Sequence, residues 1–305
     1  STNFGKALIA KTASTIKKVS MELGGHAPLI IFDDADLDLA QRELTPGALC
    51  MAGQICVAAA RFLVHKPIAK DFEARMKEAF AAVRVGPGSD PSSQMGSLID
   101  LPNRARIEAL ISQAADEGEL VLRGTPQGSG AFITPSLFRI DDVNSSLVQD
   151  ELFGPIVSIE TFEDEAEAVH KANATSYGLA ASVFTNSSSR ALRVSRKIRS
   201  GTVWVNSHLR LFAEAETGGY GKSGLGRLHG SEGPAAYTTL TRPTIMRRET
   251  SRYHETMKSR DACKNRRVPT PPTRVATATA TNIPTPERST PRHTTTNPND
   301  SDSYR

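Results

Sequence analysis

The chain has 305 residues, of which 38% are hydrophobic and 23% are charged, a composition typical of a folded protein with one large or two small domains. No apolar run reaches the roughly 18 residues that a membrane span needs, and the first residues lack the layout of a signal peptide, so we expect a cytoplasmic protein without a membrane segment. The formal charge of +4 comes from residues 251–305, where ten Lys and Arg stand against five Asp and Glu, so the rest carries −1 and has no bias toward nucleic acid.

Residues 1–207 alternate between helical and strand patterns. In chain order, the patterns predict a helix over Gly5–Ile16, strands over Val19–Leu23 and Pro28–Phe32, a helix over Ala35–Gln54, a strand over Arg61–His65, helices over Ile68–Val83 and Arg104–Glu117, a strand from residue 156, a helix over Glu163–Ala174, a strand over Leu179–Phe184, a helix over Ser188–Ile198 and a strand over Thr202–Val205. Such alternation predicts an α/β fold with a largely parallel sheet flanked by helices.

Two stretches depart from this alternation. Pro46 lies inside a predicted helix, and because proline in a helix interior costs about 3 kcal/mol, we expect a break or kink before it. Residues 250–305 are rich in Thr, Ser, Pro and Arg and have few large apolar residues. Such a segment cannot bury enough apolar surface to offset the entropy of ordering it, so we expect a disordered basic tail.

The motif M-E-L-G-G-H-A-P at residues 21–28 places Glu22 at the end of a predicted strand, before two glycines. Glycines let the backbone turn sharply and approach a ligand closely. A surface glutamate before an ordinary turn is the alternative, because short motifs often occur by chance.

Two further motifs have the same character. G-Q-I-C-V at residues 53–57 places Cys56 on a turn after a helix, whereas Cys50 lies within the predicted helix and fits the ordinary buried state of a free thiol better. E-L-F-G-P at residues 151–155 places Glu151 and Phe153 at a tight Gly-Pro turn, for which a plain turn with a hydrophobic anchor is the alternative. The seven histidines show no metal-ligand spacing, so no metal site is expected.

The order of the three motifs along the chain, E-L-G-G, then G-Q-I-C and then E-L-F-G-P, resembles that in the aldehyde dehydrogenase superfamily. Further stretches that resemble the family are Y-G-L-A-A-S-V-F-T (177–185), S-G-T-V-W-V-N (200–206) and G-G-Y-G-K-S-G-L-G-R (218–227). The opening S-T-N-F-G-K resembles the end of the family's cofactor loop. The resemblance covers residues 1 to about 245 and implies the family's catalytic domain, with a remnant of its cofactor-binding domain.

The resemblance implies a reaction at Cys56. Its thiolate would attack the carbon of a small aldehyde, and transfer of a hydride to NAD or NADP would leave a thioester. Glu22 would deprotonate the water that hydrolyses this thioester, a task for which burial would raise the pKa of its carboxyl. The backbone N–H of Cys56 would stabilise the oxyanion.

The resemblance also implies contacts to the cofactor. Ser1 would face the pyrophosphate beside a helix N-terminus, and Leu23 would lie at the cofactor site. Glu151 would accept hydrogen bonds from the nicotinamide ribose, and Phe153 would pack against it. Asn206 would support the loop that carries the nucleophile.

Four segments follow from the resemblance: the end of a cofactor-binding domain (1–22), a catalytic thiol domain (23–207), a C-terminal return segment and strand (208–249) and the disordered tail (250–305). Most of the family's cofactor domain has no counterpart in the sequence.

Three functions therefore stay open: an NAD(P)-dependent aldehyde dehydrogenase, a truncated and catalytically incompetent remnant, or a cofactor-independent thiol esterase. A homo-oligomer is implied for an intact family member, though not for this fragment.

Overall fold

The computed structural model describes residues 1–230, and the predicted tail together with residues 231–249 lies outside the described residues. The strands are β1 (Met21–Glu22), β2 (Ala27–Ile31), β3 (Ala59–His65), β4 (Glu119–Leu122), β5 (Pro126–Gln127), β6 (Phe132–Ile133), β7 (Ser136–Arg139), β8 (Ile156–Phe162), β9 (Ala180–Phe184), β10 (Thr202–Val205) and β11 (Gly224–Leu225). The α-helices are α1 (Thr2–Thr12), α2 (Leu37–Leu49), α3 (Ala69–Ala81), α4 (Leu101–Glu117), α5 (Ser146–Gln149), α6 (Glu165–Ala172) and α7 (Ser188–Ser195).

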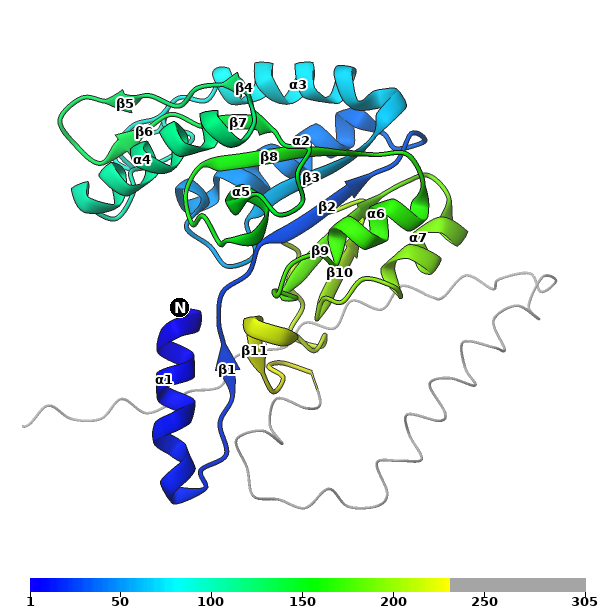
Figure 1. The fold of residues 1–305 in the computed structure, drawn as a ribbon. Helices are drawn as coiled ribbons and strands as arrows, with labels where there is room; N and C mark the ends of the chain where they lie inside the picture. Colours follow the sequence, from blue (N-terminus) through cyan, green and yellow to red (C-terminus); the bar gives the residue numbers. More distant parts are fainter. Residues whose placement is uncertain (231–305) are drawn as a thin grey trace, which may run out of the picture. The chain divides into compact units, whose positions relative to one another are not determined.

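Seven of the strands form one sheet in the order β10-β9-β2-β3-β8-β7-β4 (Figure 1). All neighbouring pairs are parallel except β4 and β7, which run antiparallel at one edge. Parallel neighbours need crossover connections, and α2 supplies the one between β2 and β3, while α7 supplies the one between β9 and β10. The predicted α/β class with a largely parallel sheet is therefore confirmed.

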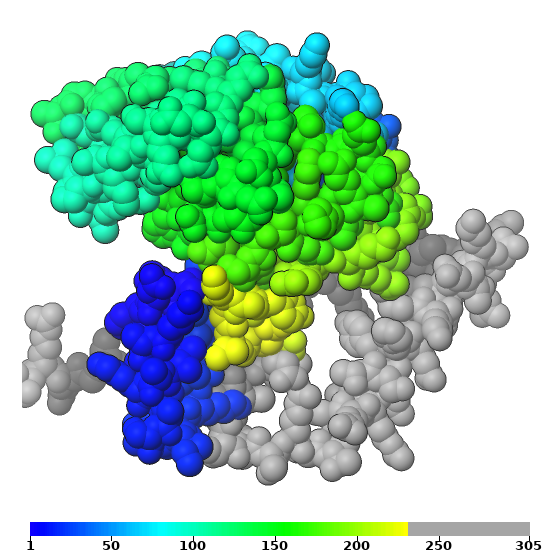
Figure 2. Space-filling view, in the orientation of Figure 1, coloured from blue at the N-terminus to red at the C-terminus, as the bar shows by residue number. Residues whose placement is uncertain are grey.

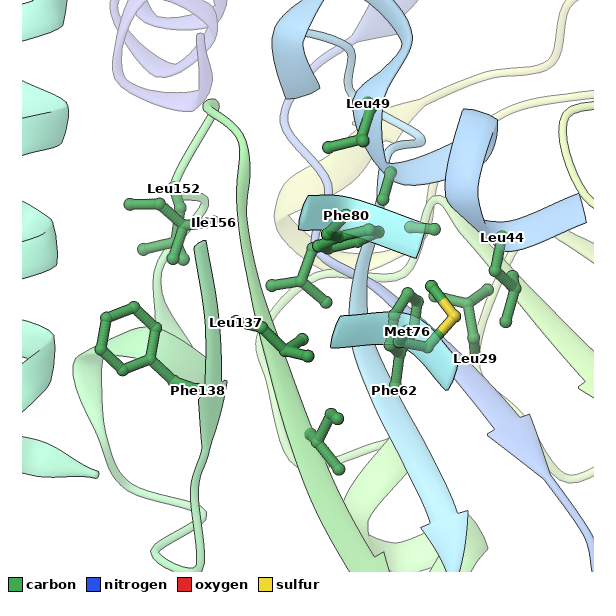
Figure 3. Packing of buried hydrophobic residues seen from close by; sticks show 14 of the residues in the cluster. Leu29, Leu44, Leu49, Phe62, Met76, Phe80, Leu137, Phe138, Leu152 and Ile156 are labelled. Carbon is green, nitrogen blue, oxygen red and sulfur yellow. The ribbon is translucent and has the colours of Figure 1, made fainter. Parts of the chain in front are cut away.

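The sheet is covered by helices on both faces, as the alternation along β2 shows. Leu29 and Ile31 pack into a cluster that includes side chains from α2, α3 and α4, some of which are labelled in Figure 3. Ile30 and Phe32 point into a second cluster with α6 and α7. Because each fully buried side chain of this size contributes about 1.5–3 kcal/mol, burial on both faces explains why the strand is apolar at every position.

Each predicted helix is present, with ends that differ by a few residues, but no break occurs before Pro46. α2 continues through Pro46 to Leu49. The missing N–H of proline removes only one bond near the end of the helix, and the N–H of Cys50 still donates to the Pro46 carbonyl. The backbone leaves the helical conformation later, at Met51 and Ala52, where φ is 51° and 55°. Strands β4 and β7 have no counterpart among the predicted strands.

A small two-stranded sheet lies outside the main one. β1 pairs antiparallel with β11, so that Met21 faces Leu225 and Glu22 faces Gly224. The N–H of Leu23 extends this pairing by donating to the Ser223 carbonyl at 3.0 Å. Figure 2 shows the dark blue start of the chain beside the yellow segment that contains β11. The predicted return segment thus contacts the strand that contains Glu22.

Candidate active site

The three motifs lie at the amino-terminal ends of three central strands of the main sheet. Residues 21–25 precede β2, residues 53–57 precede β3 and residues 151–155 precede β8, and these three strands are adjacent and parallel. The amino-terminal ends of parallel neighbours lie at the same edge, so segments far apart in the sequence become neighbours.

Two glycines allow these segments to touch. A Cβ atom on Gly25 would lie 2.2 Å from the Cys56 carbonyl oxygen, closer than real Cβ contacts allow. Gly53 has φ of 72°, and a Cβ there would lie 2.2 Å from the Gly154 carbonyl oxygen. The E-L-G-G motif therefore packs against the cysteine turn, and the cysteine turn packs against the Gly-Pro turn.

Cys56 is half-buried on a turn in which the Ala58 N–H donates to the Ile55 carbonyl at 3.0 Å. Burial raises the pKa of the Cys56 thiol above its usual value, and the negative charges of Glu151 and Glu22 raise it further. Hydrogen bonds from the backbone N–H groups of Cys56 and Val57 act in the opposite direction. The structure thus brings the predicted nucleophile close to two of the predicted carboxylates, and these charges oppose its ionisation.

Glu22 ends β1 opposite Gly224 and is exposed to solvent. Neighbouring protein atoms displace part of the water around its carboxyl, and this desolvation raises the pKa of the carboxyl, while the charges of Arg227 and His229 in the return segment lower it. The direction agrees with the predicted general base, which needs a pKa closer to neutrality than an ordinary glutamate has.

Glu151 and Phe153 lie on the turn before β8. Burial raises the pKa of Glu151, although the carboxylate accepts a hydrogen bond from the Gly25 N–H at 2.9 Å. Phe153 has a left-handed φ of 51° and leaves 42% of its surface exposed. Arg106 on α4 holds this turn, because its guanidinium donates to the carbonyls of Leu152 at 2.9 Å and Phe153 at 3.2 Å. An exposed aromatic ring on a strained backbone is a feature of ligand sites.

Ser1 and Leu23 border the same region. Ser1 caps α1, a helix of eleven residues, since its hydroxyl accepts the Phe4 N–H at 3.4 Å. Leu23 packs closely on Gly5 of α1, where an added Cβ would lie 2.5 Å from the leucine methyl group. The Thr2 hydroxyl is within 3.1 Å of where a Cβ of Gly24 would lie, so the helix N-terminus adjoins the E-L-G-G motif.

One expectation about a neighbour of the nucleophile is wrong. Cys50 is exposed rather than buried, because it follows the last residue of α2 and lies where the helix gives way to a 3-10 turn. The side chain of Asn206 accepts the Thr185 N–H and donates to the Thr185 carbonyl, both at 3.0 Å. A contact to the cysteine turn comes from His208, which lies 3.0 Å from the Val57 carbonyl.

Arg106 and His208 are the functional candidates that the sequence alone did not reveal as such. Arg106 lies in a regular helix pattern, and His208 follows a strand without any recognisable spacing to Cys56.

Within residues 1–230, no group of three or more His, Cys, Asp or Glu could hold a metal ion. In the same range, no helix is long and apolar enough to cross a membrane.

Comparisons with known proteins agree with these motifs. The family model described as "Aldehyde dehydrogenase family" matches residues 1–242. The chain is 40% identical over 241 residues to a succinate-semialdehyde dehydrogenase of Paenarthrobacter nicotinovorans, covering 78% of this chain and 54% of that protein. It is 40% identical over 238 residues to a betaine aldehyde dehydrogenase of Cereibacter sphaeroides, covering 77% and 49%. The chain therefore spans about half the length of the relatives it matches.

Solved structures show the same similarity. A betaine aldehyde dehydrogenase from Staphylococcus aureus in complex with NAD+ matches with a TM-score of 0.74 and 37% identity, covering 77% of this chain and 48% of that one. An aldehyde dehydrogenase structure from Burkholderia cenocepacia matches with a TM-score of 0.76 and 33% identity, covering 78% and 50%.

Proposed function

Because this chain belongs to the aldehyde dehydrogenase family, we propose that it supplies the thiol and the base of an NAD(P)-dependent oxidation of an aldehyde to a carboxylic acid. Cys56 is the nucleophile and Glu22 is the base. The observation that supports this most directly is the convergence of the three motifs at one sheet edge, where Glu22 and Glu151 are close enough to Cys56 to raise the pKa of its thiol.

The residues at this edge fit a dinucleotide. The exposed ring of Phe153 offers a flat apolar surface, and Glu151 is a carboxylate that already accepts one N–H bond. Ser1 and Leu23 border the first turn of α1, and the N–H groups of a helix N-terminus suit an anion such as a pyrophosphate. We propose that Ser1, Leu23, Glu151 and Phe153 hold NAD or NADP. When bound, the cofactor supplies the acceptor for the aldehydic hydride.

The Cys56 thiolate would add to the aldehyde carbon and form a C–S bond, with the electron pair of the carbonyl moving to oxygen. The backbone N–H of Cys56, which favours a thiolate at rest, would then donate toward this oxygen. After oxidation the acyl group remains on the Cys56 sulfur as a thioester.

Glu22 would act in the second half of the reaction. Its carboxylate would remove a proton from a water, whose oxygen adds to the thioester carbon. The C–S bond then breaks and the Cys56 thiolate leaves. Desolvation by neighbouring protein atoms makes this carboxylate a stronger base than an ordinary glutamate, and Arg227 limits the effect.

The proposed substrate is a small aldehyde without an assigned charge. Two relatives at 40% identity are named for succinate semialdehyde, which is anionic, and for betaine aldehyde, which is cationic, so sequence identity does not select between them.

We further propose that residues 1–22 end a cofactor-binding domain, that 23–207 form the catalytic domain and that 208–249 form a return segment. The β1–β11 pairing outside the main sheet supports this division. We expect a homo-oligomer for the complete enzyme.

A cofactor-independent thiol esterase is the second candidate, because Cys56 and Glu22 are both present in the described chain and ester cleavage needs no hydride acceptor. The 305-residue chain should be incubated with p-nitrophenyl acetate and separately with an aldehyde and NAD or NADP. We expect acetylation of Cys56 by intact-mass and peptide analysis, and accumulation of the acetyl form in Glu22→Gln, because hydrolysis needs the base.

Cys56→Ser should abolish the acetylation, and Cys50→Ser is the matched control that should retain it. Formation of NAD(P)H that is lost in Cys56→Ser and retained in Cys50→Ser would assign the dehydrogenase activity to this chain. Acetylation of Cys56 without NAD(P)H would limit the chain to thiol and base chemistry. Acetylation that persists in Cys56→Ser would contradict the nucleophile assignment.

A further inference from the structure

His208 lies between β10, α2 and β9, close to the cysteine turn. It follows β10 and is 97% removed from solvent, with only 3% of its surface exposed. Its ring packs edge-on against Trp204 at a centroid distance of 5.0 Å. On α2 the backbone of Gly47 comes so close that an added Cβ would lie 2.7 Å from the imidazole. Surrounded in this way, the ring has little freedom to rotate.

Both ring nitrogens have hydrogen-bond partners. Nε2 lies 3.0 Å from the Val57 carbonyl oxygen, and Nδ1 lies 2.9 Å from the Ser182 hydroxyl on β9. A carbonyl can only accept, so Nε2 carries the proton and donates to Val57. In the neutral ring Nδ1 is then an acceptor, and the Ser182 hydroxyl donates to it. The two partners therefore specify one tautomer and one orientation.

Val57 connects this histidine to the sulfur. Its carbonyl accepts the bond from His208, while its N–H is one of the two backbone donors that favour the Cys56 thiolate. On the other side of the turn, Gly25 packs against the Cys56 carbonyl. Each peptide bond is planar, so the Val57 N–H moves together with the Cys56 carbonyl, and the Val57 carbonyl moves together with the Ala58 N–H. Gly25 and His208 therefore restrain the two peptide planes that meet at Val57, and this limits rotation of its backbone.

We propose that His208, oriented by Ser182, is a positioning residue for the nucleophile: it fixes the peptide plane that follows Val57, and together with the contact of Gly25 on the preceding plane it keeps the Val57 N–H directed at the Cys56 sulfur. The inference rests on the proposed role of Cys56. It assigns a function to a histidine that contacts neither the thiol nor either of the two carboxylates that act on it.

The surroundings keep His208 neutral. Burial lowers the pKa of its imidazole to about 4, while the bond to the Val57 carbonyl and the charge of Glu43 act in the opposite direction. Glu43 on α2 accepts the His208 backbone N–H at 3.3 Å and pairs with Arg210 at 3.0 Å. Near neutral pH the ring therefore acts as a fixed donor and acceptor, and it does not add a positive charge beside the thiolate.

The test is the rate of alkylation by iodoacetamide, resolved by peptide mass spectrometry across pH in the full chain. His208→Leu removes both hydrogen bonds of the imidazole. At pH values below the pKa of the Cys56 thiol, it should slow the alkylation of Cys56 on the order of fourfold. The loss of one hydrogen bond to a charged group reduces the thiolate population, and the greater nucleophilicity of a more basic thiolate compensates in part. His208→Gln can donate to Val57 and accept from Ser182, so it should restore the rate to within about twofold.

Cys50 in the same molecule is the internal reference, and its rate should not change. Ser182→Ala should slow Cys56 less than His208→Leu and should add nothing in the double variant, because it acts only through the ring. Ser136→Ala is the matched control: Ser136 is equally buried, lies on β7 and bonds the Gly124 N–H at 2.9 Å.

The proposal is overturned by an unchanged Cys56 rate in folded His208→Leu, by a parallel fall at Cys50, or by a His208→Gln variant that folds and is as slow as the leucine variant. Should His208→Leu fail to fold, Ser182→Ala against Ser136→Ala decides in either direction. Failure of the proposed function would appear separately, in the ester and aldehyde assays, because alkylation requires neither substrate nor cofactor.

Discussion

The half-buried thiol of Cys56 lies in a field of negative charge, which distinguishes it from Cys50. Glu151 and Glu22 both raise the pKa of the Cys56 thiol, and Glu151 has the larger effect. Cys50 lies on the surface, where reagents reach it directly. For the chain by itself, we therefore expect Cys50 to be alkylated faster than Cys56 near neutral pH, although Cys56 is the proposed nucleophile.

A first prediction follows from these charges. Glu151→Gln should increase the alkylation rate of Cys56 roughly threefold at pH 7, and Glu22→Gln should increase it less, because each removes a negative charge that opposes the thiolate. The glutamine at 151 can still accept the Gly25 N–H, so the packing is preserved. Peptide-resolved iodoacetamide kinetics measure both rates, with Cys50 as the reference. A larger effect of Glu22→Gln, or no effect of either, would contradict the order of charges.

A second prediction concerns the close contact at Gly25. Gly25→Ala should cost about 1–3 kcal/mol in free energy of unfolding, because the new methyl group overlaps the Cys56 carbonyl at 2.2 Å and a backbone atom must move. Gly96→Ala is the control, since nothing lies within 4 Å of its added Cβ. Urea unfolding of both variants gives the comparison. Equal stability of the two would mean that the contact between the E-L-G-G motif and the cysteine turn is not tight.

At the scale of the elements, β3 and β8 are joined by a buried ion pair as well as by their ladder. Arg61 and Glu160 are 0% and 2% exposed, and the guanidinium donates twice to the carboxylate, at 2.8 and 2.9 Å. The same guanidinium donates to the Lys171 carbonyl at the end of α6, at 3.0 Å. The ion pair thus joins β3 and β8, the adjacent strands that follow the second and third motifs.

The third prediction tests this pair. Arg61→Met should lower the free energy of unfolding by about 3–5 kcal/mol, because Glu160 would be left buried without a partner. The double variant Arg61→Met with Glu160→Leu should recover much of the loss. Arg193→Met is the control: it breaks a pair with Glu165 in which the arginine is 49% exposed, and should cost less than about 1 kcal/mol. Chemical denaturation distinguishes the two cases, and a small loss in Arg61→Met would show that the pair does not hold the strands.

For the whole molecule, two buried histidines link folding to pH. Burial, together with the charge of Arg61, lowers the pKa of His26 to about 3, and burial lowers the pKa of His208 to about 4. An unfolded chain binds a proton on each ring below about pH 6.5, whereas the folded chain does not. Stability that is fully present above pH 6.5 is therefore lost as the pH falls toward 4.

The fourth prediction is the slope of that loss. Between pH 6.5 and 4 each histidine should contribute up to about 1.4 kcal/mol of destabilisation per pH unit. His26→Gln, which can still donate to the Leu147 carbonyl, should make the dependence shallower by about one proton. His170→Gln, at an exposed position of α6, is the control and should leave the slope unchanged. Denaturant midpoints across this range provide the measurement, and an unaltered slope in His26→Gln would exclude the buried neutral imidazole.

Local patterns in the sequence predicted every α-helix of the described residues except α5, and six of their eleven strands, because a buried strand such as β2 needs apolar residues on both faces and an amphipathic helix such as α3 needs them on one. Strands β5, β6 and β11 have two residues each, too few to show a period, and β4 and β7 were not predicted either. The motifs around Glu22, Cys56 and Glu151 indicated these residues only through their combined resemblance to the aldehyde dehydrogenase family, because each motif alone also fits an ordinary turn or a buried thiol. The glycine at position 25 then permits the close approach of two of the motifs.

Only the tertiary structure decided which residues meet. The adjacency of β2, β3 and β8 depends on long-range strand order, which no local pattern contains, and it alone brings the carboxylates of Glu22 and Glu151 to the Cys56 thiol. The same holds for Cys50, which local composition suggested was buried and which is exposed at the end of α2. It holds equally for His208, whose contact with Val57 spans 151 residues of sequence. Burial and contact are properties of packing between elements, so they could be expected from the sequence only where a motif already implied them.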